Sequence, residues 1–346
     1  MSNRIIIPLS ALILAIIFSA VPLTNVSSQD NFQQQVKTLF APLPAAMESK
    51  DNPITPEKTH LGKMLFFETR ISVDRTVSCS KCHLMSLYAT DGLKKAVGNN
   101  CKLNPRNAPT VLNAADQISE HWIGNRVSVE DQAKQSLIAP LTFGLSSYKD
   151  VELKLKAIPG YDSLFRLAFP GEKDPVNADN FALAVGAWER TLVTPGRFDM
   201  YVKGDTTALT RTERDGLALF IKTGCVGCHS GPYLGGTMHD KFGPTQPYWN
   251  LTHSEEIDVG RFAVTKKEED KYVFKVPNLR NVAMTSPYFH DGSVSDMKSA
   301  VKIMAQLEVN TTFDDKQADL IVAFLKSLTC QLPEDALTVP ILPPEN

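Results

Sequence analysis

The sequence predicts a mainly α-helical protein that is divided into two domains. Apolar residues recur at helical spacing over several long segments, whereas segments with the alternating pattern of a β-strand are few. The pentapeptide Cys-x-x-Cys-His occurs twice, at residues 79–83 and at residues 225–229. A chain of 346 residues is long enough for two domains. We therefore expect one copy of the motif in each domain.

Each copy of the motif is the attachment signature of a c-type haem. The two thiols bond to the vinyl groups of the porphyrin, and the histidine becomes an axial ligand of iron. A thioredoxin-type dithiol or half of a zinc site would leave the histidine after each pair unexplained. With 6 Cys and 7 His in the chain, two chance copies are negligible. The expected fold is two cytochrome c-like helical domains with one c-type haem each. The residues predicted to hold the haems are Cys79, Cys82, His83, Cys225, Cys228 and His229.

The first 28 residues are predicted to be a secretory signal peptide. Arg4 supplies a positive charge, residues 5–18 form an almost unbroken apolar run, and small residues precede Gln29. The run is shorter than the ~20 residues that a membrane span needs, and an uncleaved anchor is the alternative. Export to the bacterial periplasm fits the haem prediction, because c-type haem is attached outside the cytoplasm.

The charge of the chain excludes one class of partner. The net charge is −2, so a strongly basic surface for nucleic acid is not expected. Acidic and basic residues are interspersed, and no block of charge identifies another partner. After the first 28 residues, no stretch of sequence is long and apolar enough to span a bilayer.

Two segments of the N-terminal half have the signals of a helix. Residues 128–138 begin with Ser128, which is a plausible N-cap, and continue into helix-forming residues. Residues 179–192 carry a broad apolar stripe that includes Trp188. The first haem motif lies ahead of both helices.

The C-terminal half has a similar pattern around the second haem motif. Thr210 and Glu213 form a capping box ahead of a helix that leads into this motif. Residues 296–304 and 314–328 are two further amphipathic segments. Residues 272–276 are the candidate for a short strand.

A linker is expected between the two domains. Residues 194–198 contain Pro and Gly, and the polar segment 203–207 follows shortly after. We place the boundary near residue 200. The predicted division is a signal peptide over residues 1–28, an N-terminal haem domain over residues 29–200 and a C-terminal haem domain over residues 201–346.

Two cysteines are not used by the haem motifs. In an oxidising compartment Cys101 and Cys330 are first interpreted as a disulfide. Free thiols, or a role for one of them beside a haem, are the alternatives. The sequence does not show whether the two residues come within bonding distance.

The segments around both motifs resemble bacterial dihaem cytochrome c peroxidases. The resemblance extends from about residue 61 to residue 332, and the related MauG-type enzymes, which oxidise residues of a partner protein, share much of the pattern. The clearest match is Leu-Arg-Asn-Val-Ala-Met-Thr-Ser-Pro-Tyr-Phe-His-Asp-Gly at residues 279–292. The other matching segments are residues 61–68, 70–72, 78–83, 105–113, 131–134, 260–264, 301–304 and 321–328.

The resemblance implies that Met304 is the distal ligand of the C-terminal haem, opposite His229. For any one of the nine Met residues, packing in the core is the ordinary interpretation. MauG-type enzymes typically carry a Tyr at this position, so Met304 favours the arrangement of the peroxidases. A thioether ligand raises the potential of a haem. The C-terminal haem would then accept electrons from a small cytochrome c or a cupredoxin.

Other residues acquire roles from the same resemblance. Trp122 falls where the family places a Trp between the two haems, although a core Trp is the alternative. Gln132 matches a polar residue of the peroxidatic pocket, and His290 matches a His near the C-terminal haem.

A calcium site between the domains is also implied by the resemblance. Its ligands would be Asn107 and the backbone carbonyls of Thr285 and Pro287, which are oxygen ligands of the kind that calcium prefers.

The sequence departs from the family in the pocket of the N-terminal haem. Many dihaem peroxidases hold a displaceable His where this chain has Asn99, so this haem is expected to be open without reductive activation. The family places an acid/base Glu where this chain has Thr142. A hydroxyl cannot shuttle protons as a carboxylate does, and loss of such a group costs about 100- to 10,000-fold in rate. The loop that follows Trp122 also differs, and Cys101 lies near the altered segment.

Three functions remain open from the sequence. The first is a periplasmic enzyme that reduces hydrogen peroxide with electrons from a small redox protein. The second is a divergent MauG-like enzyme whose open haem acts on a nitrogen oxide or a protein side chain. The third is an electron carrier without turnover, which an open N-terminal haem would argue against. The family often forms dimers, so a homodimer is a further expectation.

Overall fold

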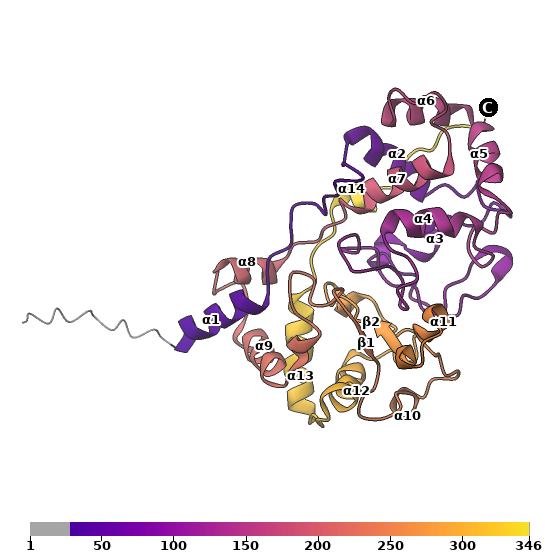
Figure 1. The fold of residues 1–346 in the computed structure, drawn as a ribbon. Helices are drawn as coiled ribbons and strands as arrows, with labels where there is room; N and C mark the ends of the chain where they lie inside the picture. The colour runs from indigo at the N-terminus through magenta and orange to yellow at the C-terminus, as the bar shows by residue number, and fades with distance from the viewer. Residues whose placement is uncertain (1–27, 346) are drawn as a thin grey trace, which may run out of the picture.

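The computed structural model describes residues 28–345. The predicted signal peptide lies almost entirely outside the described residues. The described chain is mostly helical, which confirms the predicted fold class. Figure 1 shows an N-terminal half that contains α2 to α7 and a C-terminal half that contains α9 to α13 and a small sheet.

The helices of the described chain are mostly short. The α-helices are α1 (Ser28–Leu39), α2 (Pro56–Phe66), α3 (Cys79–Cys82), α4 (Val129–Ile138), α5 (Tyr148–Lys156), α6 (Pro159–Ala168), α7 (Ala178–Glu189), α8 (Arg197–Lys203), α9 (Arg211–Lys222), α10 (Trp249–Thr252), α11 (Phe262–Thr265), α12 (Met297–Val309), α13 (Asp315–Ser327) and α14 (Glu334–Leu337). Short 3-10 helices cover Met85–Leu87, Asn99–Cys101, Cys225–Gly227, Glu268–Asp270 and Val282–Met284. The strands β1 (His239–Lys241) and β2 (Val273–Lys275) pair antiparallel.

The predicted helices are confirmed with small shifts at their ends. Ser128 caps α4 by accepting a hydrogen bond from the backbone N–H of Asp131. Thr210 and Glu213 form the capping box of α9 as expected. The helix predicted over residues 296–304 continues for more than one further turn, to the end of α12. The predicted strand corresponds to β2, and its partner β1 was not expected.

The two halves are built around the same kind of helix crossing. In the N-terminal half, α2 precedes the first haem motif and packs against α7. A Cβ atom at Gly62 of α2 would lie 1.9 Å from the carbonyl oxygen of Ala184 on α7. In the C-terminal half, α9 leads into the second motif and packs against α13. There a Cβ at Gly216 would lie 2.0 Å from the carbonyl oxygen of Leu320. Glycine therefore permits the close approach of the two helices in each half.

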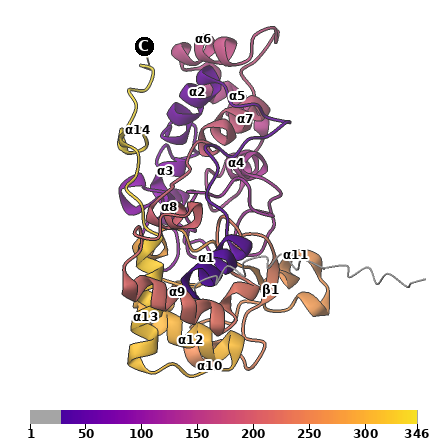
Figure 2. The same ribbon diagram turned by 90° about the vertical axis from the view of Figure 1, so that its left-hand side faces the viewer.

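The ends of the chain cross between the halves. Val36 and Phe40, at the end of α1, belong to the core of the C-terminal half. The segment after α13 turns back, and Cys330, Leu332 and Ala336 belong to the core of the N-terminal half. Both Figure 1 and Figure 2 show this C-terminal segment running from α13 past α14 along the N-terminal half. Each core is completed by a segment from the opposite end of the chain.

The predicted disulfide between Cys101 and Cys330 is wrong. Both thiols are free, Cys101 is exposed, and Cys330 is buried. Cys330 packs in the core of the N-terminal half, whereas Cys101 ends a short 3-10 helix at the surface. The prediction rested only on the oxidising character of the periplasm. The fold places one thiol at the surface and the other in a core, so the two residues do not pair.

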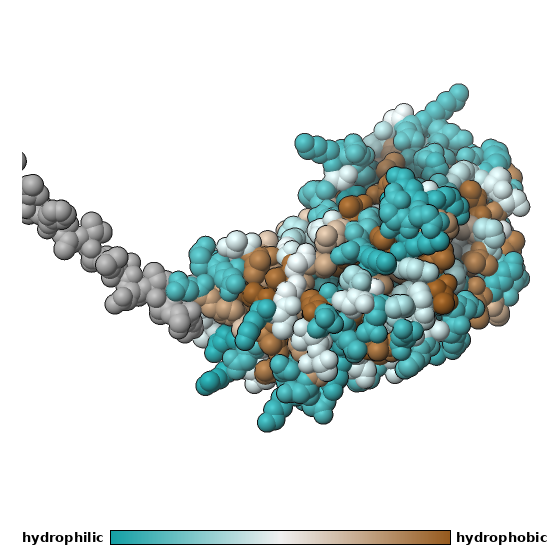
Figure 3. Space-filling model, turned by 60° about the horizontal axis from the view of Figure 1, so that its bottom comes forward, coloured by the Kyte–Doolittle hydropathy of each residue, from teal (hydrophilic) through white to brown (hydrophobic). Residues whose placement is uncertain are grey.

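The surface is mixed in character. On the face drawn in Figure 3, hydrophobic residues form scattered groups between hydrophilic ones. Within residues 28–345, no helix combines the length and the apolar character that crossing a bilayer requires.

Candidate active site

The first haem motif leaves one nitrogen of its histidine free to bind iron. Cys79 and Cys82 lie on α3, and the backbone N–H of His83 donates to the carbonyl of Cys79 at 3.0 Å. The ring Nδ1 of His83 lies 3.2 Å from the carbonyl oxygen of Ala89. A carbonyl only accepts hydrogen bonds, so Nδ1 carries the proton and Nε2 is left as the ligand atom. Burial also lowers the pKa of His83, which favours the neutral ring that binds iron.

The second haem motif repeats this arrangement. The backbone N–H of His229 donates to the carbonyl of Cys225 at 2.9 Å, and the Nδ1–H of its ring donates to Leu234 at 2.9 Å. Ala89 and Leu234 both have a left-handed backbone, with φ of 57° and 51°. In each site the chain therefore turns sharply after the motif, so that a backbone carbonyl accepts a hydrogen bond from the histidine ring.

A cavity adjoins the first motif. It is lined by Cys79, Cys82 and His83 together with Gln132, Thr142 and Phe143, among others. A second, smaller cavity lies next to it, and His83, Gln132 and Glu189 line both. Two thiols, a histidine with a free Nε2 and a partly apolar cavity fit a covalently attached haem.

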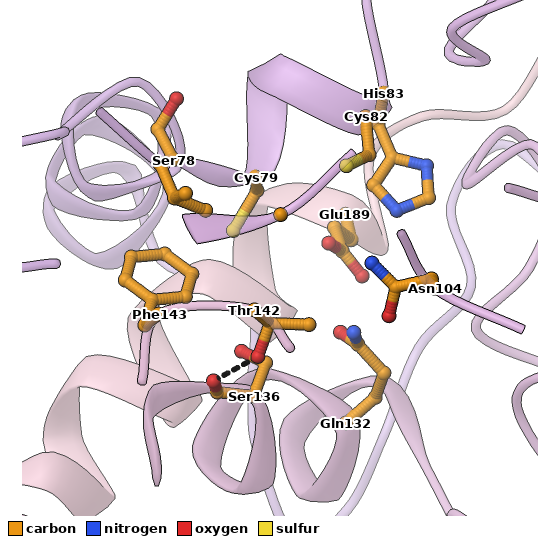
Figure 4. Close-up of a pocket in the computed structure, with 12 residues that line it drawn as sticks. Ser78, Cys79, Cys82, His83, Asn104, Gln132, Ser136, Thr142, Phe143 and Glu189 are labelled. Atoms are coloured by element: carbon orange, nitrogen blue, oxygen red, sulfur yellow. Dashed lines mark hydrogen bonds between the residues drawn. The ribbon is translucent and has the colours of Figure 1, made fainter. Parts of the chain in front are cut away.

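Gln132 is the predicted pocket residue that the structure places in the cavity. It lies on α4, which packs against α7, and Figure 4 shows its amide among the residues that line the pocket. An amide can both donate and accept a hydrogen bond. Gln132 can therefore bind either end of a small polar molecule in this space.

The two departures from the family pattern are connected to each other. The hydroxyl of Thr142 donates to the backbone carbonyls of Ser136 and Ala139, the latter at 3.2 Å, and the first bond is drawn in Figure 4. The amide of the buried Asn99 donates to the carbonyls of Pro140, at 2.8 Å, and Thr142, at 2.7 Å. The proton of the Thr142 hydroxyl is thus used by the backbone, and Asn99 holds the loop that carries Thr142.

Trp122 lies where the two halves meet. Its indole N–H donates to the carbonyl of Asn107 at 3.0 Å. Its own carbonyl accepts from the backbone N–H of Lys275, on β2, at 2.7 Å. The residue is therefore bonded to the N-terminal half through its ring and to the C-terminal half through its backbone.

Asn107 contacts the segment that carries the other predicted calcium ligands. Its backbone N–H donates to the carbonyl of His290 at 2.9 Å, and its side-chain amide donates to Leu93 at 2.8 Å. Thr285 and Pro287 lie a few residues before His290. No group of three or more His, Cys, Asp or Glu within the described residues could hold a metal. The predicted calcium ligands are not of these residue types, since they are a side-chain amide and two backbone carbonyls.

Met304 lies half-buried on α12, and its neighbours Val301 and Ala305 belong to the core of the C-terminal half. Cys225, from the second motif, packs against the same core. His290 is buried and stacks on Phe274 with ring centroids 4.2 Å apart. Helix α12 therefore lies in the half where a ligand opposite His229 is expected.

Sequence reasoning missed the acidic residues of the two cavities. Glu189 is 2% exposed and lines both, and Glu120 is 7% exposed and lines the second together with His121. Burial raises the pKa of Glu189 well above its usual value, and the nearby Glu120 carboxyl adds to the effect. The available signal was an acidic residue within the apolar stripe of residues 179–192.

The comparisons with known proteins agree with this geometry. The model of the di-haem cytochrome c peroxidase family matches residues 56–207. The cytochrome c551 peroxidase of Pseudomonas aeruginosa is 39% identical over 99% of this chain and 97% of its own length. The methylamine utilization protein MauG of Methylorubrum extorquens is 36% identical over 85% of this chain and 84% of its own length.

A solved structure shows the same architecture. It belongs to a MauG-like protein associated with microbial copper homeostasis. The TM-score is 0.76 at 25% identity, with 86% of this chain and 97% of the other covered. Together with the two motifs, these likenesses show a protein with two c-type haems and the chemistry of an oxidoreductase. The chain belongs to the di-haem cytochrome c peroxidase family.

Proposed function

We propose that this protein is a periplasmic enzyme that reduces hydrogen peroxide at its N-terminal haem. Electrons would enter at the C-terminal haem from a small cytochrome c or a cupredoxin. One observation carries the proposal. The cavity beside His83 adjoins the loop of Pro140 and Thr142, and the Asn99 amide donates to the backbone carbonyls of both residues. Asn99 cannot move to iron as a displaceable His would, so peroxide can enter without prior reduction.

When bound, the haem supplies the iron that takes the peroxide and passes the electrons. The residues of the chain bind the haem and orient the peroxide. His83 is held in one tautomer by the Ala89 carbonyl, so its Nε2 would bind the haem iron. The amide of Gln132 hydrogen-bonds the peroxide, and Phe143 forms an apolar wall of the cavity. Trp122 lies between the two halves and shortens the path of the electrons.

The C-terminal haem has the role of electron entry in this proposal. His229 and Met304 would be its two axial ligands, and a thioether ligand raises the potential of the iron. We further propose that Asn107 and the carbonyls of Thr285 and Pro287 bind calcium, that residues 1–28 direct export, and that the protein forms a homodimer. Metal analysis, N-terminal sequencing of the mature protein and sedimentation test these three points in turn.

The spectrum of the oxidised protein, as isolated, tests the central proposal. We expect one high-spin haem, which is the N-terminal one, and one low-spin haem with Met ligation. Rapid mixing with hydrogen peroxide should change the high-spin signals at once, without a reductant. The matched variant Met304→His should lower the potential of the second haem and leave the first haem high-spin. Two low-spin haems, or an open haem that is inert to peroxide, would contradict the proposal.

A second candidate is oxidation of another substrate, such as a nitrogen oxide or a protein side chain. It is favoured by the engaged hydroxyl of Thr142, which cannot donate a proton to peroxide. The same rapid-mixing experiment decides, because this candidate requires a slow reaction with peroxide. The proposal of peroxide reduction therefore needs another acid in the cavity.

A further inference from the structure

The cavities beside the first haem motif hold two carboxyl groups. Glu189 lines both cavities, whereas Glu120 lines only the second. The two other residues shared by both cavities are His83 and Gln132. In Figure 4 the carboxyl of Glu189 lies between the ring of His83 and the amide of Gln132. Glu189 thus occupies the junction at which the predicted iron ligand and the predicted pocket amide meet.

The carboxyl of Glu189 has no partner that would use its proton. Among the described residues, no group donates a hydrogen bond to this carboxyl or accepts one from it. The guanidinium of Arg190, the next residue, is directed to Glu130 instead, with nitrogen–oxygen distances of 2.7 and 3.1 Å. A buried carboxyl without a charge partner is normally held in its protonated form.

Several ionisable groups surround Glu189. Glu120 and Glu130 both raise its pKa in addition to the larger effect of burial, whereas Arg190 lowers it. Cys79, on α3, also lies close enough to be affected by Glu189. The sum of these effects favours the carboxylic acid over the carboxylate.

The position of Glu189 is fixed by packing. It is the last residue of α7, which crosses α2 at Gly62 and packs against α4. Helix α4 carries Gln132. One pair of packed helices therefore sets the distance between the acid and the amide, as a general acid requires.

We propose that Glu189 is the proton donor for cleavage of the O–O bond, the role that Thr142 cannot perform. The inference rests on the proposed reduction of peroxide at this haem. It assigns the acid/base group to α7, at a site distant in sequence from the position of the family's Glu.

The proton and electron count of the step balances. The Glu189 carboxylic acid gives its proton to the departing oxygen, which keeps the bonding pair of the O–O bond and leaves as water. The Glu189 carboxylate then takes the proton of the remaining oxygen. Two electrons, which the small redox protein supplies through the haems, and two protons from solvent convert that oxygen to a second water. The sum is one peroxide, two electrons and two protons to two waters.

The variant Glu189→Gln tests the proposal, because it keeps the shape of the side chain and removes the acid. We expect the rate of reaction with peroxide to fall by about 10²- to 10⁴-fold, with the pH dependence of the remaining rate flattened. The double variant Glu189→Gln/Thr142→Glu should recover much of the rate, since it returns a carboxyl to the same cavity. Asp179→Asn, which changes an exposed carboxyl at the other end of α7, is the matched control and should keep the rate.

One readout does not depend on turnover and tests the protonation of Glu189. The infrared spectrum of the oxidised wild type should contain a carboxylic-acid band that Glu189→Gln lacks, whereas the bands of Glu120 and Glu308, whose pKa values burial also raises, should remain. The catalytic role is tested separately by the flattened pH dependence and by the rescue with Thr142→Glu, which a merely structural role of Glu189 would not produce.

The outcomes separate the two proposals. Wild type that is inert to peroxide overturns the proposed function, and the infrared measurement still tests the protonation of Glu189. Wild-type rates in Glu189→Gln, or a loss in Glu120→Gln instead, overturn the inference alone. If Glu189→Gln does not take up haem, Glu189→Asp replaces it. A displacement of about 1 Å can cost ~10²-fold, so an unchanged rate and pH profile in Glu189→Asp also overturns the inference.

Discussion

In our proposal, single polar residues determine the chemistry of the N-terminal haem pocket. The resemblance places Asn99 and Thr142 where the family has a displaceable ligand and an acid, and both side chains donate hydrogen bonds to backbone carbonyls. Glu189 has no such bond. The chemical capacity of the N-terminal pocket thus depends on which side chains remain without partners, and the residue types alone do not reveal this.

Glu308 provides a prediction at the same scale. It lies on α12, and burial raises its pKa from 4.5 to about 7 although the backbone N–H of Gly243 donates to it. Between these two pH values the folded state binds more protons than the unfolded state, so the free energy of unfolding falls as pH rises. Glu308→Gln stays neutral and should not show this fall. Above pH 7 it should exceed wild type by up to about 2–3 kcal/mol.

Denaturant unfolding at a series of pH values measures the effect of Glu308→Gln. Below pH 4.5 the variant and the wild type should have similar stability, because the carboxyl is then protonated in both states. Glu48→Gln, at an exposed position, is the control. A difference between Glu308→Gln and wild type that does not change with pH would contradict the prediction.

At the scale of elements, each half contains a helix crossing of the same kind. The helix before each haem motif carries a glycine that faces a backbone carbonyl of a later helix. The crossing fixes where the motif begins, and the left-handed residue after the motif returns a carbonyl to the histidine. The position of each haem motif therefore depends on a helix contact that lies outside the motif itself.

Gly62→Ala and Gly216→Ala test this dependence. Their Cβ atoms would lie 1.9 and 2.0 Å from carbonyl oxygens of the facing helix, so the backbones must separate. We expect each variant to lose about 3 kcal/mol in the free energy of unfolding, measured by denaturant titration. Ser163→Ala on the exposed side of α6 should change it by less than ~0.5 kcal/mol. Equal stability of Gly62→Ala and Ser163→Ala would show that the crossing is not tight.

At the scale of the whole molecule, the two halves are joined by exchanged chain ends as well as by their interface. Val36 and Phe40 complete one core, and Leu332 and Ala336 complete the other. An ion pair between Arg106 and Asp258, at 2.7 Å, also connects the halves. The halves should therefore unfold together and not in two separate steps.

Leu332 and Ile341 offer a matched pair within the C-terminal segment. Leu332 is 7% exposed in the core of the N-terminal half, whereas Ile341 is 93% exposed. Leu332→Ala should cost about 2–5 kcal/mol, and Ile341→Ala should change the stability by less than ~0.5 kcal/mol. Denaturation followed through the absorption of the N-terminal haem measures both. If the two variants unfold alike, the segment does not contribute to that core.

The sequence predicted what is local and missed what is assembled at long range. The haem motifs, the cap at Ser128 and the capping box at Thr210 depend on neighbouring residues, and the structure confirms α4 and α9. Helix α2 was missed because its apolar residues are confined to its second half, from Leu61 onward, which weakens the amphipathic pattern. The proposed role of Glu189 depends on where α7 meets the haem cavity. The local pattern shows only an acidic residue within an apolar stripe and does not show what that residue faces.

The exchanged ends have a consequence for the order of events as the chain is made. Synthesis proceeds from the N-terminus, and Leu332 and Ala336 emerge after most of the other residues of the first core. That core therefore stays incomplete while the whole C-terminal half is being made. Because Cys79 packs against the same core, the surroundings of the first haem site are completed only after the C-terminal half exists.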